Sequence, residues 1–459
     1  MKKNRVRFYF TIIFVKISTK IMKLLGKNAT HLPGWMANRM CPNFLEHLEK
    51  PERLVYITGT NGKTTVSNLV ADILKDNGYD FVNNGTGSNI ADGIVSALLA
   101  RSTFFGKAKC KLGILEVDER YSPRIYPYMK PDYLVCTNLF RDSYKRNAHS
   151  EFIFDILDNQ IPSNTKLILN GEDLISNHLA INNERCYFGI NCQDEKSSSD
   201  NIIKDIVACP KCGATLQFDY IRYNHIGRGH CPNCDFGSPE MNYTIESIDY
   251  SNHRCVVKTP EGVTDFKLLG ENITDAYNMI TAISTLMELG LSLEAIKTSF
   301  EKIKLASTRY DSQLVNGKEL IMNLAKGQNP IACSRVCDFI SHEEGNKAVV
   351  LMIDDFYDAK ETSENIAWIY DIDFEFLNQD NVKQIICSGV RNKDYHLRLL
   401  MAGIPEEKIC CCERELDAGN CVDFDKVDKV FLLYDVYTIH YANEVLASIK
   451  NRLEKESGK

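Results

Sequence analysis

The chain has 459 residues, which is too long for one average hydrophobic core, so two or three domains are expected. An apolar fraction of 44% and a charged fraction of 25% describe an ordinary soluble globular protein, and the net charge of −7 argues against a general nucleic-acid binder. The apolar run Phe8–Val15 is short, is followed by Lys16 and lacks a small-residue cleavage site, so it is not a convincing signal peptide. The sequence therefore predicts a cytoplasmic protein whose seventeen cysteines are thiols or metal ligands.

Residues 1–48 are expected to form a basic, apolar helical segment. The first thirty residues contain eight Lys and Arg and no acid, with apolar residues between them. Such a helix could lie on the anionic inner face of the cell membrane. The alternative is a helix that packs on its own domain and keeps its lysines in water. The apolar run is too short to span a bilayer.

Strand and helix patterns alternate through residues 49–305, which we predict to be a P-loop central domain with a parallel sheet. The expected strands are 53–60, 113–118, 132–139 and 166–173, and the expected helices are 64–77 and 275–289. A second α/β pattern begins near residue 310, with strands at 319–325, 348–355, 384–390 and 429–435. It predicts a C-terminal Rossmann-like α/β domain over residues 306–459.

The stretch "TGTNGKTT" lies between a predicted strand and a predicted helix, which is the context of a phosphate-binding loop. Two glycines allow a tight turn, Lys63 supplies a cation and Thr64 supplies a hydroxyl ligand for Mg²⁺. Ile57 stands where the general Walker pattern has its first glycine, so that pattern fits in part, and a merely structural turn is the alternative. The candidate nucleotide-binding residues are Gly59, Thr60, Asn61, Gly62, Lys63, Thr64 and Thr65.

Glu116 ends the predicted buried strand in "ILEVDER". A buried carboxylate is costly unless it has a partner, and ligands of α/β sheets bind at the carboxyl ends of strands. Glu116 is therefore the candidate Mg²⁺ ligand, and Asp118 is a weaker one. The alternative is that these carboxylates accept the free N–H groups at the start of a helix.

Cys209, Cys212, Cys231 and Cys234 form two CxxC pairs separated by eighteen residues. This spacing predicts a zinc ribbon inserted at about residues 205–240, and four thiolates leave no open position, so the Zn²⁺ should be structural. Two disulfides or redox-active pairs are the alternatives. The segment between the pairs lacks a basic cluster, which argues against nucleic-acid binding. His225 and His230 are interpreted as residues that pack in the core or that support the cysteine ligands without binding the ion.

The order of "TGTNGKTT", "LEVDE", "TNLFRD" (Thr137–Asp142) and "LNGED" (Leu169–Asp173) resembles the Mur ligase family. The four-Cys insertion narrows the resemblance to the MurT group of that family, the synthetase subunits of lipid II isoglutaminyl synthase. Four more segments are similar to that group: 32–48, 83–99, 368–375 and 388–404.

The resemblance implies an ATP- and Mg²⁺-dependent carbon–nitrogen ligase of peptidoglycan biosynthesis. Such an enzyme amidates the D-glutamate α-carboxyl of the lipid-linked precursor to D-isoglutamine. The carboxylate is first activated as an acyl phosphate, and ammonia comes from a GatD-type glutaminase subunit in a heterodimer. No nucleic-acid partner is expected.

The resemblance also assigns roles to single residues. It implies catalytic roles for Lys63 and Glu116, and nucleotide-site roles for Asn138, Asn278 and Arg309. An aspartate of the C-terminal domain is expected to complete the glutaminase triad; Asp358 is the nearest match, with Asp354 and Asp355 as alternatives. The chain departs from the family at "FRDSYKRNAHSE" and "DAKETSENIAW", so nucleotide residues match better than acceptor-side residues.

Three other functions remain open on the sequence alone. A Mur-type amino-acid ligase, or an altered MurT paralogue, would act on another acceptor. A non-catalytic scaffold would bind ATP without forming an amide. A zinc-ribbon nucleic-acid motor is disfavoured by the acidic composition.

Overall fold

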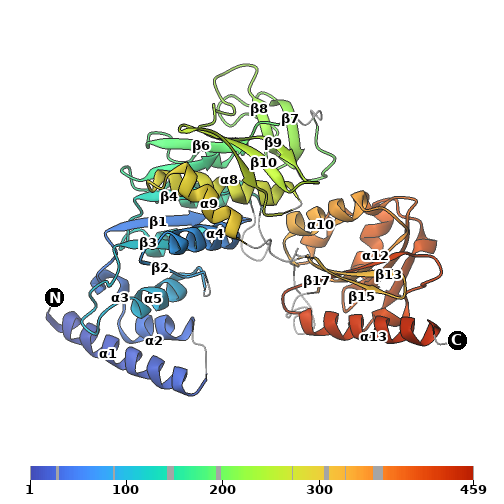
Figure 1. Cartoon of the computed structure of the whole chain (residues 1–459), viewed down its shortest axis with the longest axis horizontal. Helices are drawn as coiled ribbons and strands as arrows, with labels where there is room; N and C mark the ends of the chain where they lie inside the picture. The colour runs from blue at the N-terminus through green and yellow to red at the C-terminus, as the bar shows by residue number, and fades with distance from the viewer. Residues whose placement is uncertain are drawn as a thin grey trace. The chain divides into compact units, whose positions relative to one another are not determined.

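The computed structural model forms two compact units, each built on its own sheet (Figure 1). Unit 1 contains residues 1–140, 150–199 and 205–304, and unit 2 contains 141–149, 200–204 and 305–459. The residues that the structure describes are 2–26, 30–85, 88–141, 149–192, 198–270, 272–303, 310–325, 327–354 and 365–457.

Unit 1 has a nine-stranded sheet in the order β11-β10-β9-β6-β5-β4-β1-β3-β2. Seven neighbouring strands, β9 through β2 in that order, are parallel, and β10 and β11 join antiparallel at one edge. The bounds are β1 Arg53–Thr58, β2 Phe81–Asn83, β3 Leu112–Glu116, β4 Tyr133–Cys136, β5 Lys166–Asn170, β6 Arg185–Ile190, β9 Tyr243–Asp249, β10 Arg254–Thr259 and β11 Gly262–Lys267. All residues of β3 are buried, as expected for a parallel strand covered on both faces.

Helices cover both faces of this sheet. On one face α4 contacts β1 and β3, and α8 contacts β5, β6 and β9 (Figure 1). On the other face the apolar core joins Tyr56, Leu115 and Leu134 of the sheet to residues of the N-terminal helices and α5. Helix bounds are α1 Lys2–Leu24, α2 Leu32–Met40, α3 Phe44–His47, α4 Lys63–Asp76, α5 Ala91–Ala100, α6 Ser122–Ile125, α7 Ser150–Asp158, α8 Ile273–Glu288 and α9 Leu293–Lys302.

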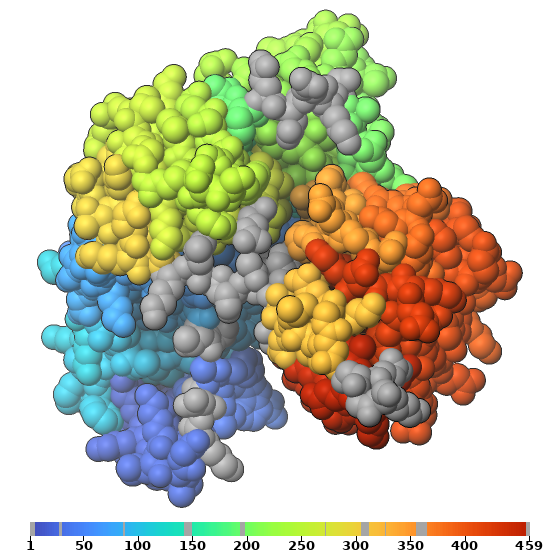
Figure 2. All heavy atoms as spheres, turned by 45° about the vertical axis from the view of Figure 1, so that its right-hand side comes forward, coloured from blue at the N-terminus to red at the C-terminus, as the bar shows by residue number. Residues whose placement is uncertain are grey.

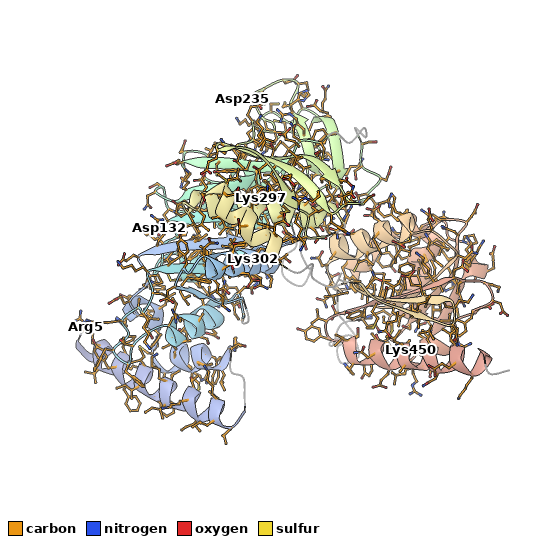
Figure 3. All side chains as sticks on the ribbon, in the orientation of Figure 1. Arg5, Asp132, Asp235, Lys297, Lys302 and Lys450 are labelled. Carbon is orange, nitrogen blue, oxygen red and sulfur yellow. The ribbon has the colours of Figure 1, made fainter. Side chains whose placement is uncertain are left out.

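Different helices pack at the two ends of unit 1. Lys302 of α9, labelled in Figure 3, pairs with Asp76 at the end of α4 at 2.8 Å. At the opposite end, α2 and α5 lie between α1 and the sheet (Figure 1). No helix among the described residues is both long enough and apolar enough to cross a bilayer.

A two-stranded hairpin, β7 (Gln217–Tyr223) and β8 (Ile226–His230), stands apart from the large sheet of unit 1. It packs on that unit through a small cluster in which Leu174 meets Leu216 and Phe236. Asp235, in the loop after β8, lies at the outer end of the unit in Figure 3.

Unit 2 has a six-stranded sheet in the order β12-β13-β17-β14-β15-β16, parallel except for the β12–β13 hairpin. The strands are β12 Tyr310–Val315, β13 Lys318–Leu324, β14 Lys347–Met352, β15 Val382–Ser388, β16 Ile409–Cys412 and β17 Lys429–Tyr434. The helices are α10 Pro330–His342, α11 Ala367–Tyr370, α12 Asn392–Met401 and α13 Ile439–Ser457. Separate apolar clusters on its two faces show that both faces are covered.

Candidate active site

The loop between β1 and α4 has the backbone geometry of a phosphate cradle. Gly59 and Gly62 have φ angles of +123° and +87°, which residues with a Cβ rarely adopt. A Cβ on Gly59 would also lie 2.2 Å from Thr137 Oγ1. The first N–H groups of α4 have no partner within the helix, because no helical carbonyl precedes them. The helix dipole also favours an anion there.

Lys63, the first residue of α4, lies inside this loop. Its ammonium forms an ion pair with Glu119 at 3.1 Å and also donates to Gly59 O. Glu119 Oε1 accepts the Gly59 N–H at 2.6 Å as well. Burial disfavours the ammonium, but the carboxylates of Glu119, Asp118 and Glu116 outweigh that effect and raise the pKa of Lys63. Lys63 is therefore a cation at neutral pH.

Thr64 and Glu116 come together at the start of α4 and the end of β3. Thr64 Oγ1 donates to Glu116 Oε2 at 2.9 Å, and Asn89 Nδ2 donates to Glu116 Oε1 at 3.0 Å. Glu116 is 6% exposed, and its backbone N–H and C=O both bond the side chain of Asn84. A hydroxyl beside a fixed carboxylate provides the oxygen ligands that Mg²⁺ prefers.

Asp118, the weaker Mg²⁺ candidate, has a different environment. Its carboxylate accepts from the Arg120 side chain at 2.7 and 3.1 Å and from the Arg120 N–H at 3.0 Å. It caps the short 3₁₀ turn Glu119–Tyr121. Asp118 therefore fits the alternative interpretation, in which the carboxylate accepts a free N–H group at the start of a helix.

The segment after β4 fixes the shape of the loop. Asn138 Oδ1 accepts the Asn61 N–H at 3.0 Å, and Asn138 Nδ2 donates to Asn61 O at 3.1 Å. Thr137 Oγ1 also donates to Asn61 O at 2.6 Å, and the Thr60 N–H donates to Asn138 O at 2.8 Å. Asn138 therefore holds the loop by both its side chain and its backbone.

Three other residues were predicted to lie at the nucleotide site: Asn278, Thr65 and Arg309. Asn278 of α8 lies so close to the loop that a Cβ on Gly62 would be 2.3 Å from Asn278 Oδ1. Thr65 lies half-buried on the first turn of α4. Arg309 lies outside the described residues.

The four cysteines converge at the base of the β7–β8 hairpin. Their sulfurs all lie within 4.8 Å of one another, with Cys209 and Cys234 at 3.5 Å and Cys212 and Cys231 at 3.4 Å. Zn–S bonds of about 2.3 Å in a tetrahedron separate the sulfurs by about 3.8 Å. The arrangement is compatible with one ion, and no disulfide joins the cysteines that the structure describes.

The tip of the hairpin contacts the segment that follows β4, next to the residues that shape the nucleotide loop. His225 Nε2 lies 3.1 Å from Asp173 Oδ1, and Asp173 Oδ2 accepts the Leu139 N–H at 2.7 Å. The His225 ring also packs on Phe140, with centroids 4.6 Å apart. Burial opposes ionisation of Asp173, but the bonds from His225 and the backbone lower the pKa of its carboxyl. His225 is thus a buried packing residue, as interpreted from the sequence, whereas the side chain of His230 is 51% exposed.

A second buried contact joins the hairpin to the end of β5. Arg222 Nε donates to Glu172 at 3.0 Å, and both side chains are almost fully buried. Tyr220 and Tyr277 donate to the same carboxylate at 2.8 and 2.9 Å. Neither Glu172 nor Glu119 was predicted as part of the site.

In unit 2, Asp354 follows β14 and is 5% exposed. Tyr395 Oη donates to its Oδ1 at 2.7 Å, and the Arg391 N–H donates to its Oδ2 at 3.3 Å. Asp355 and Asp358 lie outside the described residues.

Comparisons with known proteins identify the family of the chain. The family model of the Mur ligase middle domain matches residues 57–217, and that of the MurT ligase C-terminal region matches 326–438. The chain is 34% identical over 403 residues to the lipid II isoglutaminyl synthase (glutamine-hydrolyzing) subunit MurT of Staphylococcus aureus strain COL, covering 87% of this chain and 89% of that one. The chain belongs to the MurT family. The MurT subunit of Streptococcus pneumoniae is 29% identical over 398 residues, with 85% and 86% covered.

Membership of the MurT family confirms the prediction of an ATP-dependent ligase of the Mur type. Among solved structures, a pseudomurein peptide ligase type C from Methanothermus fervidus has a TM-score of 0.68 at 18% identity, covering 89% of this chain and 81% of that one. MurF from Acinetobacter baumannii has a TM-score of 0.58 at 14% identity, with 92% and 80% covered. These likenesses confirm the predicted Mur ligase-type α/β fold with parallel sheets.

Proposed function

We propose that this chain is the synthetase subunit of a lipid II isoglutaminyl synthase. It would convert the D-glutamate α-carboxyl of the lipid-linked peptidoglycan precursor into the amide of D-isoglutamine. The main support is the cluster of Lys63, Thr64 and Glu116 at the carboxyl ends of β1 and β3, in a chain that is 34% identical to a subunit of that name. ATP would be held by residues 59–65 together with Asn138, Asn278 and Arg309.

The reaction follows from the chemistry of a carboxylate, which is a poor electrophile. An oxygen of the acceptor carboxylate attacks the γ-phosphorus of ATP, and ADP leaves. Ammonia then attacks the acyl carbon of this acyl phosphate, phosphate leaves and the nitrogen loses a proton. Lys63 would stabilise the negative charge on the transferred phosphoryl group. A bound Mg²⁺, held by Thr64 and Glu116, would neutralise the phosphate oxygens.

The ammonia would come from a GatD-type glutaminase that binds the domain at 306–459, while the domain at 49–305 carries the ATP chemistry. The names of the relatives support this, because they describe a subunit of a glutamine-hydrolyzing enzyme. Asp358 is proposed as the acid lent to the glutaminase, with Asp355 as an alternative. Asp354 is the weakest of the three, since both of its oxygens accept bonds within unit 2.

The four cysteines are proposed to bind one structural Zn²⁺ in an inserted ribbon at about residues 205–240. The sulfur separations support this proposal, and so does a backbone turn at each CxxC pair. In the first turn the Gly213 N–H donates to Cys209 O at 2.8 Å, and in the second the Cys231 N–H donates to Phe236 O at 2.8 Å.

The test combines the purified chain with its glutaminase, ATP, Mg²⁺, glutamine and a D-glutamate-containing lipid-linked precursor. Mass spectrometry should show acid converted to amide only with ATP and a nitrogen source, and ammonium chloride should replace glutamine plus the glutaminase. Product with an amino acid but not with ammonia would identify an amino-acid ligase instead. ATP binding without any product would support the scaffold hypothesis.

Glu116→Gln is expected to raise the Mg²⁺ concentration at half-maximal rate by about tenfold or more, because one charged oxygen ligand becomes neutral. Asp118→Asn is the matched control, since Asp118 is bonded to Arg120 rather than to Thr64. Initial rates against Mg²⁺ at saturating ATP measure both variants. An equal shift in the two would remove Glu116 from the proposed metal site.

A further inference from the structure

Helix α1 has two apolar faces, and only one of them is buried. Phe8, Thr11, Ile12 and Val15 are at most 3% exposed and face the core of unit 1. The opposite face forms a stripe at helical spacing whose members are 41–79% exposed: Phe10, Ile13, Phe14, Ile17, Ile21 and Leu24. We call these six residues the α1 stripe. A helix that only packs on its own domain needs one apolar face, so the second face has another role.

Contacts on the other side of α1 hold the helix in an orientation that leaves the α1 stripe exposed. Lys16 Nζ donates to Ser102 O at 2.9 Å, and Arg7 donates to Met40 O. Phe8 packs on Phe44 of α3 with ring centroids 4.9 Å apart. Figure 1 shows α1 at the outer end of unit 1, and its dark blue atoms form the lower edge of that unit in Figure 2.

The charges of the N-terminal segment that carries the stripe have one sign. Residues 1–45 contain nine Lys and Arg and no Asp or Glu, although the whole chain has a net charge of −7. Lys20 and Lys23 are exposed on the helix, and Arg5 is exposed near its start, where Figure 3 labels it. An apolar stripe bordered by basic side chains is the pattern of a helix that lies in the interface of an anionic bilayer.

We propose that the α1 stripe and its basic border dock this chain on an anionic lipid bilayer. The charge pattern favours lipid over a second copy of the chain, because two copies paired through α1 would bring like charges together. The surface itself does not depend on the reaction. Its use, to hold the active site near a lipid-linked acceptor, rests on the proposed function.

Vesicle flotation with the full-length chain tests the proposal. The chain should float with vesicles made of equal parts phosphatidylglycerol and phosphatidylcholine, and should remain unbound with phosphatidylcholine alone. Raising the salt concentration should weaken binding, since exposed charges are screened. Equal binding to both kinds of vesicle, or to neither, would overturn the proposal.

Substitutions then locate the surface. The double variant Phe10→Glu/Ile17→Glu should lower vesicle affinity by more than about tenfold, and Lys20→Gln and Lys23→Gln by about fivefold each. Val263→Glu is the control, because Val263 is an apolar side chain of unit 1 that is 62% exposed on β11. Loss of binding by the control as well, or retention by the stripe variant, would contradict the assignment.

Two further measurements distinguish a lipid-binding surface from a dimer interface and from a part of the active site. Sedimentation of the unsubstituted chain should show no dimer that depends on the stripe. A dimer that is present in the unsubstituted chain and lost in the stripe variant would assign the stripe to contact with a second copy. Amidation of an acceptor dispersed in detergent should be unchanged in the stripe variant. Vesicle binding without amidation by the unsubstituted chain would refute the proposed function and leave the surface in place.

Discussion

Lys63→Met is expected to lower kcat for amidation by about 10³-fold or more, because it removes the cation that is proposed to stabilise the transferred phosphoryl group. The raised pKa of Lys63 keeps its ammonium charged at neutral pH, so titration of Lys63 should not change the rate of the unsubstituted chain around neutrality. Lys75→Met at the exposed end of the same helix is the matched control. Initial rates with ATP, ammonium chloride and precursor measure both variants.

The same substitution leaves the Glu119 carboxylate buried without its ion-pair partner, which should cost about 3 kcal/mol of unfolding free energy. The double variant Lys63→Met/Glu119→Gln removes the unpaired charge and keeps the bond from the Gly59 N–H. We expect the double variant to regain most of the stability and none of the activity. Activity that returned with stability would show that Lys63 acts only by holding the loop together.

The sequence is sufficient to predict the strand, loop and helix at residues 53–76, because burial, glycine spacing and helical periodicity all agree there. It also names both Thr64 and Glu116 as Mg²⁺ candidates. The structure brings the two together because β1 and β3 are parallel neighbours whose carboxyl ends share one edge. The strand pairing at the β9–β11 edge of the sheet was harder to predict from the sequence. Its pairing with β6 spans the whole hairpin insertion, so no local pattern indicates it.

Glu119 shows why part of the site was missed. Three acids lie close together in "EVDER", and the sequence ranks them only by distance from the strand. Their directions are set by the 3₁₀ turn at Glu119–Tyr121, which sends Asp118 to Arg120 and Glu119 to Lys63. The bond between His225 and Asp173 was equally hidden, since 52 residues separate the two in the chain.

Removal of the proposed Zn²⁺ is expected to destabilise unit 1 and weaken nucleotide binding together. The four sulfurs lie within 4.8 Å of one another, and a Zn²⁺ bound by four thiolates contributes directly to folding, so the ribbon should lose its fixed structure without the ion. Cys212→Ser/Cys231→Ser should lose the metal, measured by elemental analysis, and unfold at lower temperature. Cys410→Ser, in β16 of unit 2, is the control and should retain both properties. A variant without metal but with unchanged unfolding would show that the ion is not structural.

The effect on the nucleotide should pass through His225. From that ring the contacts run to Asp173, to the Leu139 N–H, and through the adjoining Asn138 to Asn61 of the loop. His225→Ala is therefore expected to weaken ATP binding by about tenfold while the Zn²⁺ remains bound. His230→Ala lies on the same hairpin but is exposed, and it should leave ATP affinity unchanged. Calorimetric titration with a nonhydrolysable ATP analogue distinguishes the two. If His225→Ala bound the analogue normally, the ribbon would stabilise the fold without reaching the nucleotide loop.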